Sequence, residues 1–102
     1  MENTNLIKCA VVKSFVAEGS RKRILSDIKQ FDASAKEAGR RKRKLTPEMQ
    51  DNLQRAKNYR NDAEYFLKKG DLFTAWGAIN YAHGILDAVR KEIGLECYGA
   101  LD

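Results

Sequence analysis

The 102-residue sequence has few of the residues that several protein classes need. Its two cysteines, Cys9 and Cys97, stand far apart with no CxxC spacing. This excludes a disulfide framework and a cysteine-based metal motif, and it favours reduced thiols in a cytosol. The single proline disfavours a β-sandwich, which needs frequent Gly/Pro turns.

Long hydrophobic runs are also missing. The longest near the N-terminus, "LIKCAVVKSFV", is broken by Lys8 and Lys13 and is shorter than the roughly 20 residues that span a bilayer. It lacks the charged region, apolar core and cleavage site of a secretory leader. We therefore expect a cytoplasmic protein with no membrane partner.

What the chain does contain is a concentrated block of positive charge. The formal net charge is +5, and the run "RRKRK" accounts for all of it, so we expect a neutral domain with one basic loop. Phosphates of RNA or another polyanion are one candidate partner. A solvated loop without a partner is the alternative, and the absence of interleaved aromatic residues disfavours base stacking. The candidate polyanion-binding residues are Arg40, Arg41, Lys42, Arg43 and Lys44.

Apolar spacing predicts three helices. Steps of three and four residues recur in three stretches, and the first of them precedes the basic loop. Thr46-Pro47 announces the second helix as a cap and first-turn proline, and Gly70-Asp71 separates the second helix from the third. Such a short connection requires a helical hairpin. The apolar faces are Ile24, Ile28, Phe31, Ala35 and Ala38; Met49, Leu53, Ala56, Ala63 and Leu67; and Leu72, Ala75, Ile79, Ala82, Leu86, Val89 and Ile93.

The fold class that follows is all-α, an up-down three-helix bundle made of a hairpin and a preceding helix. We predict three parts: an N-terminal extension at 1–19, the bundle at 20–96 and a tail at 97–102. Apolar residues of the extension point all round on a helix and do not alternate as in a strand. We expect a short extra helix there, packed on the bundle or on a partner chain, and we take Ser20 as the N-cap of the first bundle helix.

The third helix carries polar residues within an uncharged run. On a helical wheel, one flank of its apolar seam carries Trp76, Asn80, His83, Asp87 and Arg90. Arg60 lies in the apolar face of the second helix. We predict an interhelix cluster in which Arg60 meets Asn80, His83 or Asp87. One interpretation is a polar network that fixes helix register, and the other is a ligand or catalytic site. No third metal ligand accompanies His83 and Asp87, so we expect no metal and no cofactor.

Two glycines weaken the same helix. Gly77 and Gly84 each cost about 1 kcal/mol relative to alanine, which indicates close packing against the first helix, the N-terminal segment or a second copy of the chain. Together with nearby aromatic residues they form the predicted interaction surface, which consists of Phe73, Trp76, Gly77, Tyr81 and Gly84.

The stretch "AKNYRNDAEYFLKKGDLFTAWGAINYAHGILDA" resembles domain of unknown function 357. The resemblance rests on Tyr59, Asp62-Ala63, Tyr65-Phe66-Leu67, Gly70-Asp71, Ala75, Asn80-Tyr81-Ala82-His83-Gly84 and Leu86-Asp87-Ala88. It implies a small helical bundle, an archaeal cytoplasmic protein and a family without an established activity. Residues 1–20 are an addition to that core.

Three functions follow from these observations. The leading hypothesis is a non-enzymatic module for protein interaction or self-association, with a protein partner or a homo-oligomer such as a dimer. The second is an RNA- or polyanion-binding protein that uses residues 40–44. The third is an enzyme that works through Arg60, His83 and Asp87. The sequence identifies no small-molecule substrate.

Overall fold

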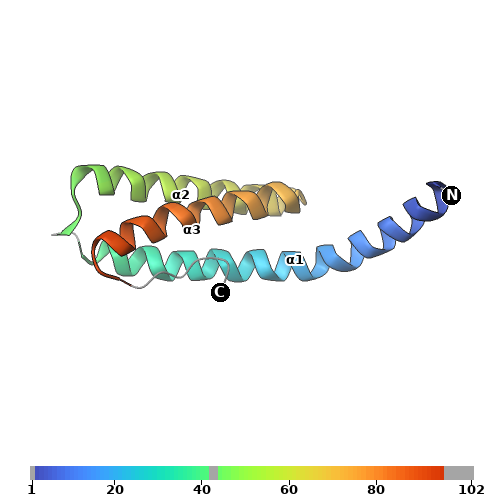
Figure 1. Ribbon diagram of the computed structural model, residues 1–102, viewed down its shortest axis with the longest axis horizontal. Helices are drawn as coiled ribbons and strands as arrows, with labels where there is room; N and C mark the ends of the chain where they lie inside the picture. Colours follow the sequence, from blue (N-terminus) through green and yellow to red (C-terminus); the bar gives the residue numbers. More distant parts are fainter. Residues whose placement is uncertain (1, 42–43, 96–102) are drawn as a thin grey trace.

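The computed structural model describes the backbone of residues 2–41 and 44–95 and the side chains of 20–41 and 44–95. Three helices make up the fold: α1 (Glu2–Gly39), α2 (Pro47–Lys68) and α3 (Leu72–Glu92). They run up, down and up, side by side, and the described ranges contain no strand (Figure 1). The predicted all-α three-helix bundle is confirmed. The predicted tail at 97–102 lies outside the described residues.

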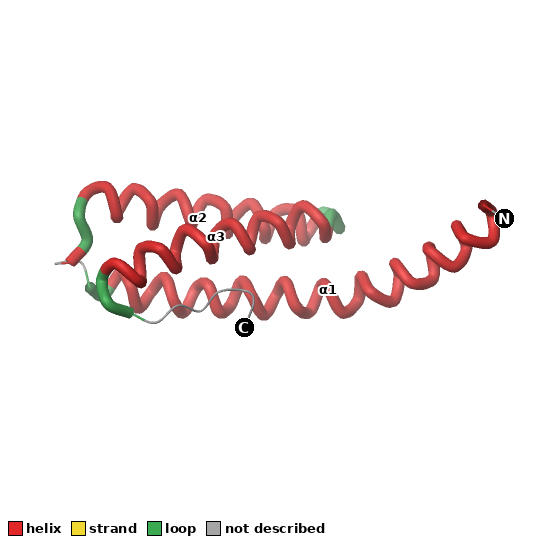
Figure 2. Tube along the Cα trace, viewed as in Figure 1, coloured by secondary structure: helices red, strands yellow, loops and turns green. Residues whose placement is uncertain are grey.

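The N-terminal region differs from the expectation of a separate short helix. Residues 2–19 belong to α1, which continues without a break through Gly19 and Ser20 (Figure 2). Ser20 is therefore not an N-cap. A helix can pass through one glycine at a cost of about 1 kcal/mol, so a glycine–serine pair alone does not force a boundary. A proline or a left-handed residue would have done so.

The other boundaries follow the local chemistry. The Thr46 side chain accepts a hydrogen bond from the Met49 backbone N–H at the start of α2, and Pro47 occupies the first turn. The Asp71 side chain accepts one from the Thr74 N–H at the start of α3. Between the two helices Gly70 takes a φ of 84°, a left-handed conformation in which a side chain would be strained. Three residues, Lys69, Gly70 and Asp71, thus link α2 to α3, and the left-handed glycine and the aspartate cap fix the hairpin.

The core consists of the predicted apolar faces. Every predicted α1 position is buried, and in α3 the seam from Ala75 to Ile93 is at most 5% exposed. Met49 and Leu72, at the ends of their helices, are only partly buried. Leu45, from the link between α1 and α2, is also buried and anchors that link against the core. The buried hydrophobic residues are Ile24, Ile28, Phe31, Ala35, Ala38, Leu45, Leu53, Ala56, Ala63, Leu67, Ala75, Ile79, Ala82, Leu86, Val89 and Ile93.

The helices differ greatly in length. α1 has 38 residues and spans about 57 Å, whereas α2 and α3 have 22 and 21 residues and span about 33 Å. The Arg21 guanidinium donates to the Leu67 carbonyl in the last turn of α2, so α1 passes the hairpin turn near Arg21. The N-terminal part of α1 projects beyond that end of the bundle (Figure 1).

Candidate functional site

Two polar side chains of α3 bind the backbone of α1. His83 Nε2 lies 2.8 Å from the Asp27 carbonyl oxygen, and Arg90 Nη1 donates to the Ser34 carbonyl at 3.0 Å. Both bonds join residues 56 positions apart, and they stand seven residues from each other on each helix. They are consecutive rungs of one ladder. Together they tie α1 to α3 in a parallel register.

The rungs lie inside the bundle. His83 is 1% exposed and Arg90 is not exposed at all. The His83 ring meets Phe31 edge to face, with centroids 5.6 Å apart. A carbonyl can only accept, so Nε2 carries the proton of the His83 bond. Arg90 also donates to the Glu37 carboxylate at 3.0 Å, which places an opposite charge beside the buried guanidinium.

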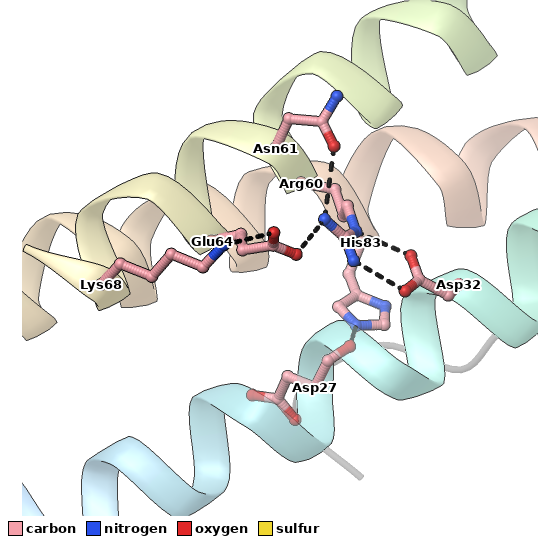
Figure 3. Close-up of polar contacts among 7 residues, drawn as sticks. All are labelled: Asp27, Asp32, Arg60, Asn61, Glu64, Lys68 and His83. Carbon is pink, nitrogen blue, oxygen red and sulfur yellow. Dashed lines mark hydrogen bonds and ion pairs between the residues drawn. The ribbon is translucent and has the colours of Figure 1, made fainter.

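Arg60 of α2 also binds α1, through the side chain of Asp32. Its Nε and Nη2 donate to the two carboxylate oxygens of Asp32 at 2.8 and 2.9 Å, a bidentate pair (Figure 3). A third nitrogen donates to Glu64 and to the Asn61 side chain, and Lys68 also donates to Glu64. The bond to Asp32 is the main reason that the pKa of Arg60 is raised. Arg60, followed by Lys68, lowers the pKa of Glu64.

The predicted contact of Arg60 with Asn80, His83 or Asp87 is therefore replaced by contacts with α1. The prediction considered only the hairpin, in which Arg60 and His83 are level. In the bundle α1 offers acceptors to both, a carboxylate to Arg60 and a backbone carbonyl to His83 (Figure 3). Asp87 is partly buried and has an interaction of its own. Among the described residues no group of three or more His, Cys, Asp or Glu could hold a metal ion.

Buried polar atoms beside the rungs are incompletely satisfied. His83 Nδ1 and Asp27 Oδ2 are buried and have no hydrogen-bond partner, whereas Asp27 Oδ1 accepts from Arg23 at 3.1 Å. The His83 ring is too deeply buried to meet a substrate without movement of α1. This arrangement favours a structural role for the histidine.

Asn80 takes part in a different feature, an open groove between α2 and α3. The groove has a volume of about 680 Å³, and Tyr81 at its edge contacts Tyr59 with ring centroids 4.6 Å apart. Gly77 and Gly84 line it and face open space, because a Cβ added to either would meet no atom within 4 Å. The predicted packing of α1 against these glycines is thus not found. The groove is lined by Asn52, Arg55, Gly77, Asn80, Tyr81, Gly84, Ile85 and Ala88.

Three of the large hydrophobic side chains that remain exposed lie close to the turn between α2 and α3. Phe73 is 84% exposed and Trp76 is 51% exposed, both in the first turns of α3. Tyr65 near the end of α2 is 55% exposed and Leu25 of α1 is 44% exposed. We refer to Tyr65, Phe73 and Trp76 as the hairpin-end hydrophobics. They lie at the end of the bundle from which α1 projects.

The basic loop lies at the opposite end, between α1 and α2 (Figure 1). Arg40, Arg41 and Lys44 are exposed, whereas Lys42 and Arg43 lie outside the described residues. The loop and the hairpin-end hydrophobics are therefore separated by the length of the bundle.

Comparison with protein families identifies the family of this chain. The family model for "Protein of unknown function (DUF357)" matches residues 26–95, which include the hairpin, both rungs and most of the bundled part of α1. The chain belongs to the DUF357 family. No curated protein and no solved structure matches it. The match begins within α1, so the projecting segment of this DUF357 protein precedes the matched region.

The sequence places Arg90 on the polar flank of α3, but the predicted interhelix cluster did not include it. Arg90 lies on the same flank as His83, seven residues later, and is the largest fully buried side chain. The signal was that spacing: a histidine and an arginine at i and i+7, both beside the seam, indicate two anchors to one neighbouring helix. No described helix is long and apolar enough to cross a membrane.

Removing a rung should destabilise the bundle. We expect Arg90→Ala to lower the free energy of unfolding by about 3 kcal/mol, because it removes a buried charged donor and leaves a cavity. Arg55→Ala, at an exposed position of α2, is the matched control and should change it by less than about 0.5 kcal/mol. Urea unfolding followed by circular dichroism measures both. Equal effects would show that the Arg90 rung contributes nothing.

Acid should weaken the Arg60 cluster. The folded state lowers the pKa of Glu64 below its ordinary 4.5, chiefly through the bond from Arg60. This contribution to stability is present above the ordinary value and is lost as the pH falls through the folded-state pKa. We expect the urea concentration at the unfolding midpoint to decrease as the pH is lowered below about 4.5. In Glu64→Gln this decrease should be less steep. Parallel pH profiles of the two proteins would contradict the assignment.

Three glycine-to-alanine substitutions should differ in sign. Gly77→Ala and Gly84→Ala should each raise the free energy of unfolding by about 0.5–1 kcal/mol, since the space is open and alanine favours helix. Gly70→Ala should lower it by about 1–2 kcal/mol because of its positive φ. Thermal unfolding of the three variants and the wild type measures the sign of each change in stability. A loss of stability in Gly77→Ala would reveal a neighbour that packs against the groove.

Proposed function

We propose that this DUF357 protein is a non-enzymatic helical module that associates with protein surfaces through its hairpin-end hydrophobics. The observation that carries the proposal is the exposure of Phe73 and Trp76, at 84% and 51%. Aromatic side chains dominate the energetics of protein interfaces, and clustered exposed ones on a small domain mark interaction sites. An archaeal, cytoplasmic setting remains what the family resemblance implies.

The internal use of the polar residues supports this proposal over an enzyme. His83 and Arg90 bind α1, and Arg60 is occupied by Asp32 and Glu64. A catalytic group must reach a substrate, and a nucleophile or activated water must stand beside a general base. The 1% exposure of His83 opposes such a role for Arg60, His83 and Asp87 as a set.

The basic loop favours a second candidate, binding of RNA or another polyanion. Arg40, Arg41 and Lys44 are exposed, and the run to which they belong carries the whole net charge. If all five residues of 40–44 met phosphates of duplex DNA, the affinity would fall with salt with a log–log slope of about −4.5. Loss of co-purifying nucleic acid at high salt would support this candidate.

The proposed function predicts an association that depends on Phe73 and Trp76. We expect the wild type to bind itself or a second protein, and Phe73→Ser/Trp76→Ser to lose that binding with its helical circular dichroism unchanged. Tyr81→Ser is the matched control, because Tyr81 is 54% exposed but lies on the groove. Light scattering on a sizing column gives the mass of the purified proteins. Extract of the source cells is passed over each immobilised protein, and any second protein that binds is detected in the eluate.

The absorbance ratio at 260 and 280 nm, at 50 and 500 mM salt, separates the two candidates in the same run. An association common to all three proteins, or none in any, would refute the proposed function. Nucleic acid that leaves the protein as salt rises would favour the basic loop instead.

A further inference from the structure

Three lysines form a line along α1. Lys22, Lys29 and Lys36 are spaced by seven residues, and a helix turns through about 20° less than two full turns over that distance, so all three lie on one face. All three are exposed, and Arg40, also exposed, continues the line one turn later. From Lys22 to Arg40 the line is about 27 Å long. It therefore extends along the bundle to the basic loop.

The acidic side chains of α1 leave this line uncompensated. Each carboxylate between residues 20 and 41 is paired with an arginine: Asp27 with Arg23, Asp32 with Arg60 and Glu37 with Arg90. Figure 3 shows the Asp32 pair. Among the described residues, by contrast, the side chains of the three lysines and of Arg40 have no ion-pair partner. Their charge is available to a ligand.

A groove between α1 and α2 runs beside the line. Two hollows of about 460 and 290 Å³ make up this groove, and both are lined by Gln54 and Lys57 of α2. Lys36 lines the larger hollow from α1. The carboxylate in the lining belongs to Asp32, which Arg60 binds through both of its oxygens. The groove thus carries cations on both walls and no uncompensated acid.

We propose that this surface binds a single-stranded nucleic acid, whose phosphates follow the line of cations on α1 from the basic loop. Positively charged grooves that follow the backbone are the means by which proteins bind single strands without sequence preference. This inference rests on the second candidate function, polyanion binding, and gives it a site beyond residues 40–44. It does not depend on the hairpin-end hydrophobics. We refer to the cations outside the loop as the cationic track, which consists of Lys22, Lys29, Lys36 and Lys57.

The α2 wall of the groove favours a nucleic acid over an acidic protein segment. The Gln54 amide nitrogen donates to Asn58, so the Gln54 side-chain oxygen can still accept. The Asn61 side-chain oxygen accepts from Arg60, so its amide nitrogen can still donate. Base edges and sugar hydroxyls offer both donors and acceptors, whereas carboxylates only accept. The groove therefore matches a nucleotide in more than charge.

A single row of cations matches a single row of phosphates. The neighbouring exposed positions supply no second row: Ser26 and Ala33 lie beyond the line on α1, and Asp51, Asn58 and Asp62 lie on the outer side of α2. A duplex presents phosphates on two strands, and the second strand would pass over these neutral or acidic positions. The arrangement thus favours one strand.

An anionic membrane is a poorer match for the track. Helices that bind a membrane surface combine cations with a broad apolar face that enters the lipid. In the described part of α1, Leu25 is the one large hydrophobic side chain that is exposed. Phosphates in solution need no such face.

The test compares three variants that each lose two positive charges from the full chain. Anisotropy of a labelled oligouridylate of about 20 nucleotides measures its affinity. Lys36→Gln/Lys57→Gln should weaken binding at least about tenfold at about 50 mM salt, because two phosphate contacts are lost. The log–log salt slope should become less negative by about 1.4, since each contact with a single strand contributes about 0.7.

The matched control is Arg55→Gln/Lys91→Gln, at two exposed positions away from the track. It should keep the wild-type affinity within about threefold, although its net charge equals that of the track variant. Equal losses in both would mean that total charge alone matters and would overturn the proposed site. Helical circular dichroism should be unchanged in every variant, because the substituted side chains are exposed.

Protection of lysines from acetylation gives a second readout that needs no substitution. With oligouridylate bound, Lys29, Lys36 and Lys57 should react more slowly than in the free protein, as followed by mass spectrometry. Lys69 and Lys91 are exposed and lie off the track, so their rates should not change. Protection confined to the basic loop would overturn the track.

The outcomes separate this inference from the functions proposed above. The third variant, Arg41→Gln/Lys44→Gln, removes two charges of the loop. If it loses affinity and the track variant does not, the inference is overturned and the second candidate stands. Tighter binding of an RNA duplex, of polyglutamate or of phosphatidylglycerol vesicles would overturn the assigned ligand class. A wild type that does not bind oligouridylate would refute both the inference and the second candidate, and association through Phe73 and Trp76 would be unaffected.

Discussion

The arrangement of this protein depends on two hydrogen bonds to the backbone of one helix. α2 and α3 would form a hairpin from their connection alone, but a hairpin does not determine where a third helix lies along it. The apolar seams tolerate sliding, since leucine, isoleucine and alanine contacts are similar at each turn. His83 and Arg90 oppose sliding, because a buried donor without its acceptor is costly. The Asp27 and Ser34 carbonyls supply that acceptor in the observed register. Polar groups in the core thus act as specificity elements, a role best known from coiled coils.

The ion pair between Arg60 of α2 and Asp32 of α1 complements the rungs. Arg60 holds Asp32 from outside while His83 and Arg90 bind from inside, so α1 is attached to both helices of the hairpin. His83 itself is 1% exposed, so the surrounding helices cover the histidine. The surface features that remain lie elsewhere: hydrophobic residues at one end, cations at the other and a groove between.

Much of the fold could be predicted from the sequence, and the reasons are local. The apolar spacing from Ile24 to Ala38 and from Ala75 to Ile93 determines buried faces, and the Thr46-Pro47 and Gly70-Asp71 pairs determine boundaries by capping. The unbroken α1 was missed because glycine weakens a helix without ending it. The partners of Arg60 and His83 were missed because backbone carbonyls and the Asp32 carboxylate come from a helix whose register cannot be read from its own sequence. Helical-wheel angles give the direction of a side chain but not the neighbour in that direction.

The 56-residue span of the rungs also has a consequence for the order of folding. The hairpin closes across three residues. The α1–α3 pairing must wait for a long loop to close, which costs more entropy and is slower. During synthesis α1 is made first, yet both of the side chains that lock it belong to the last helix. The acceptors at Asp27 and Ser34 stay without their inner partners until α3 has been made. Of the three helices, α1 is thus made first and is fixed in place only when the third is present.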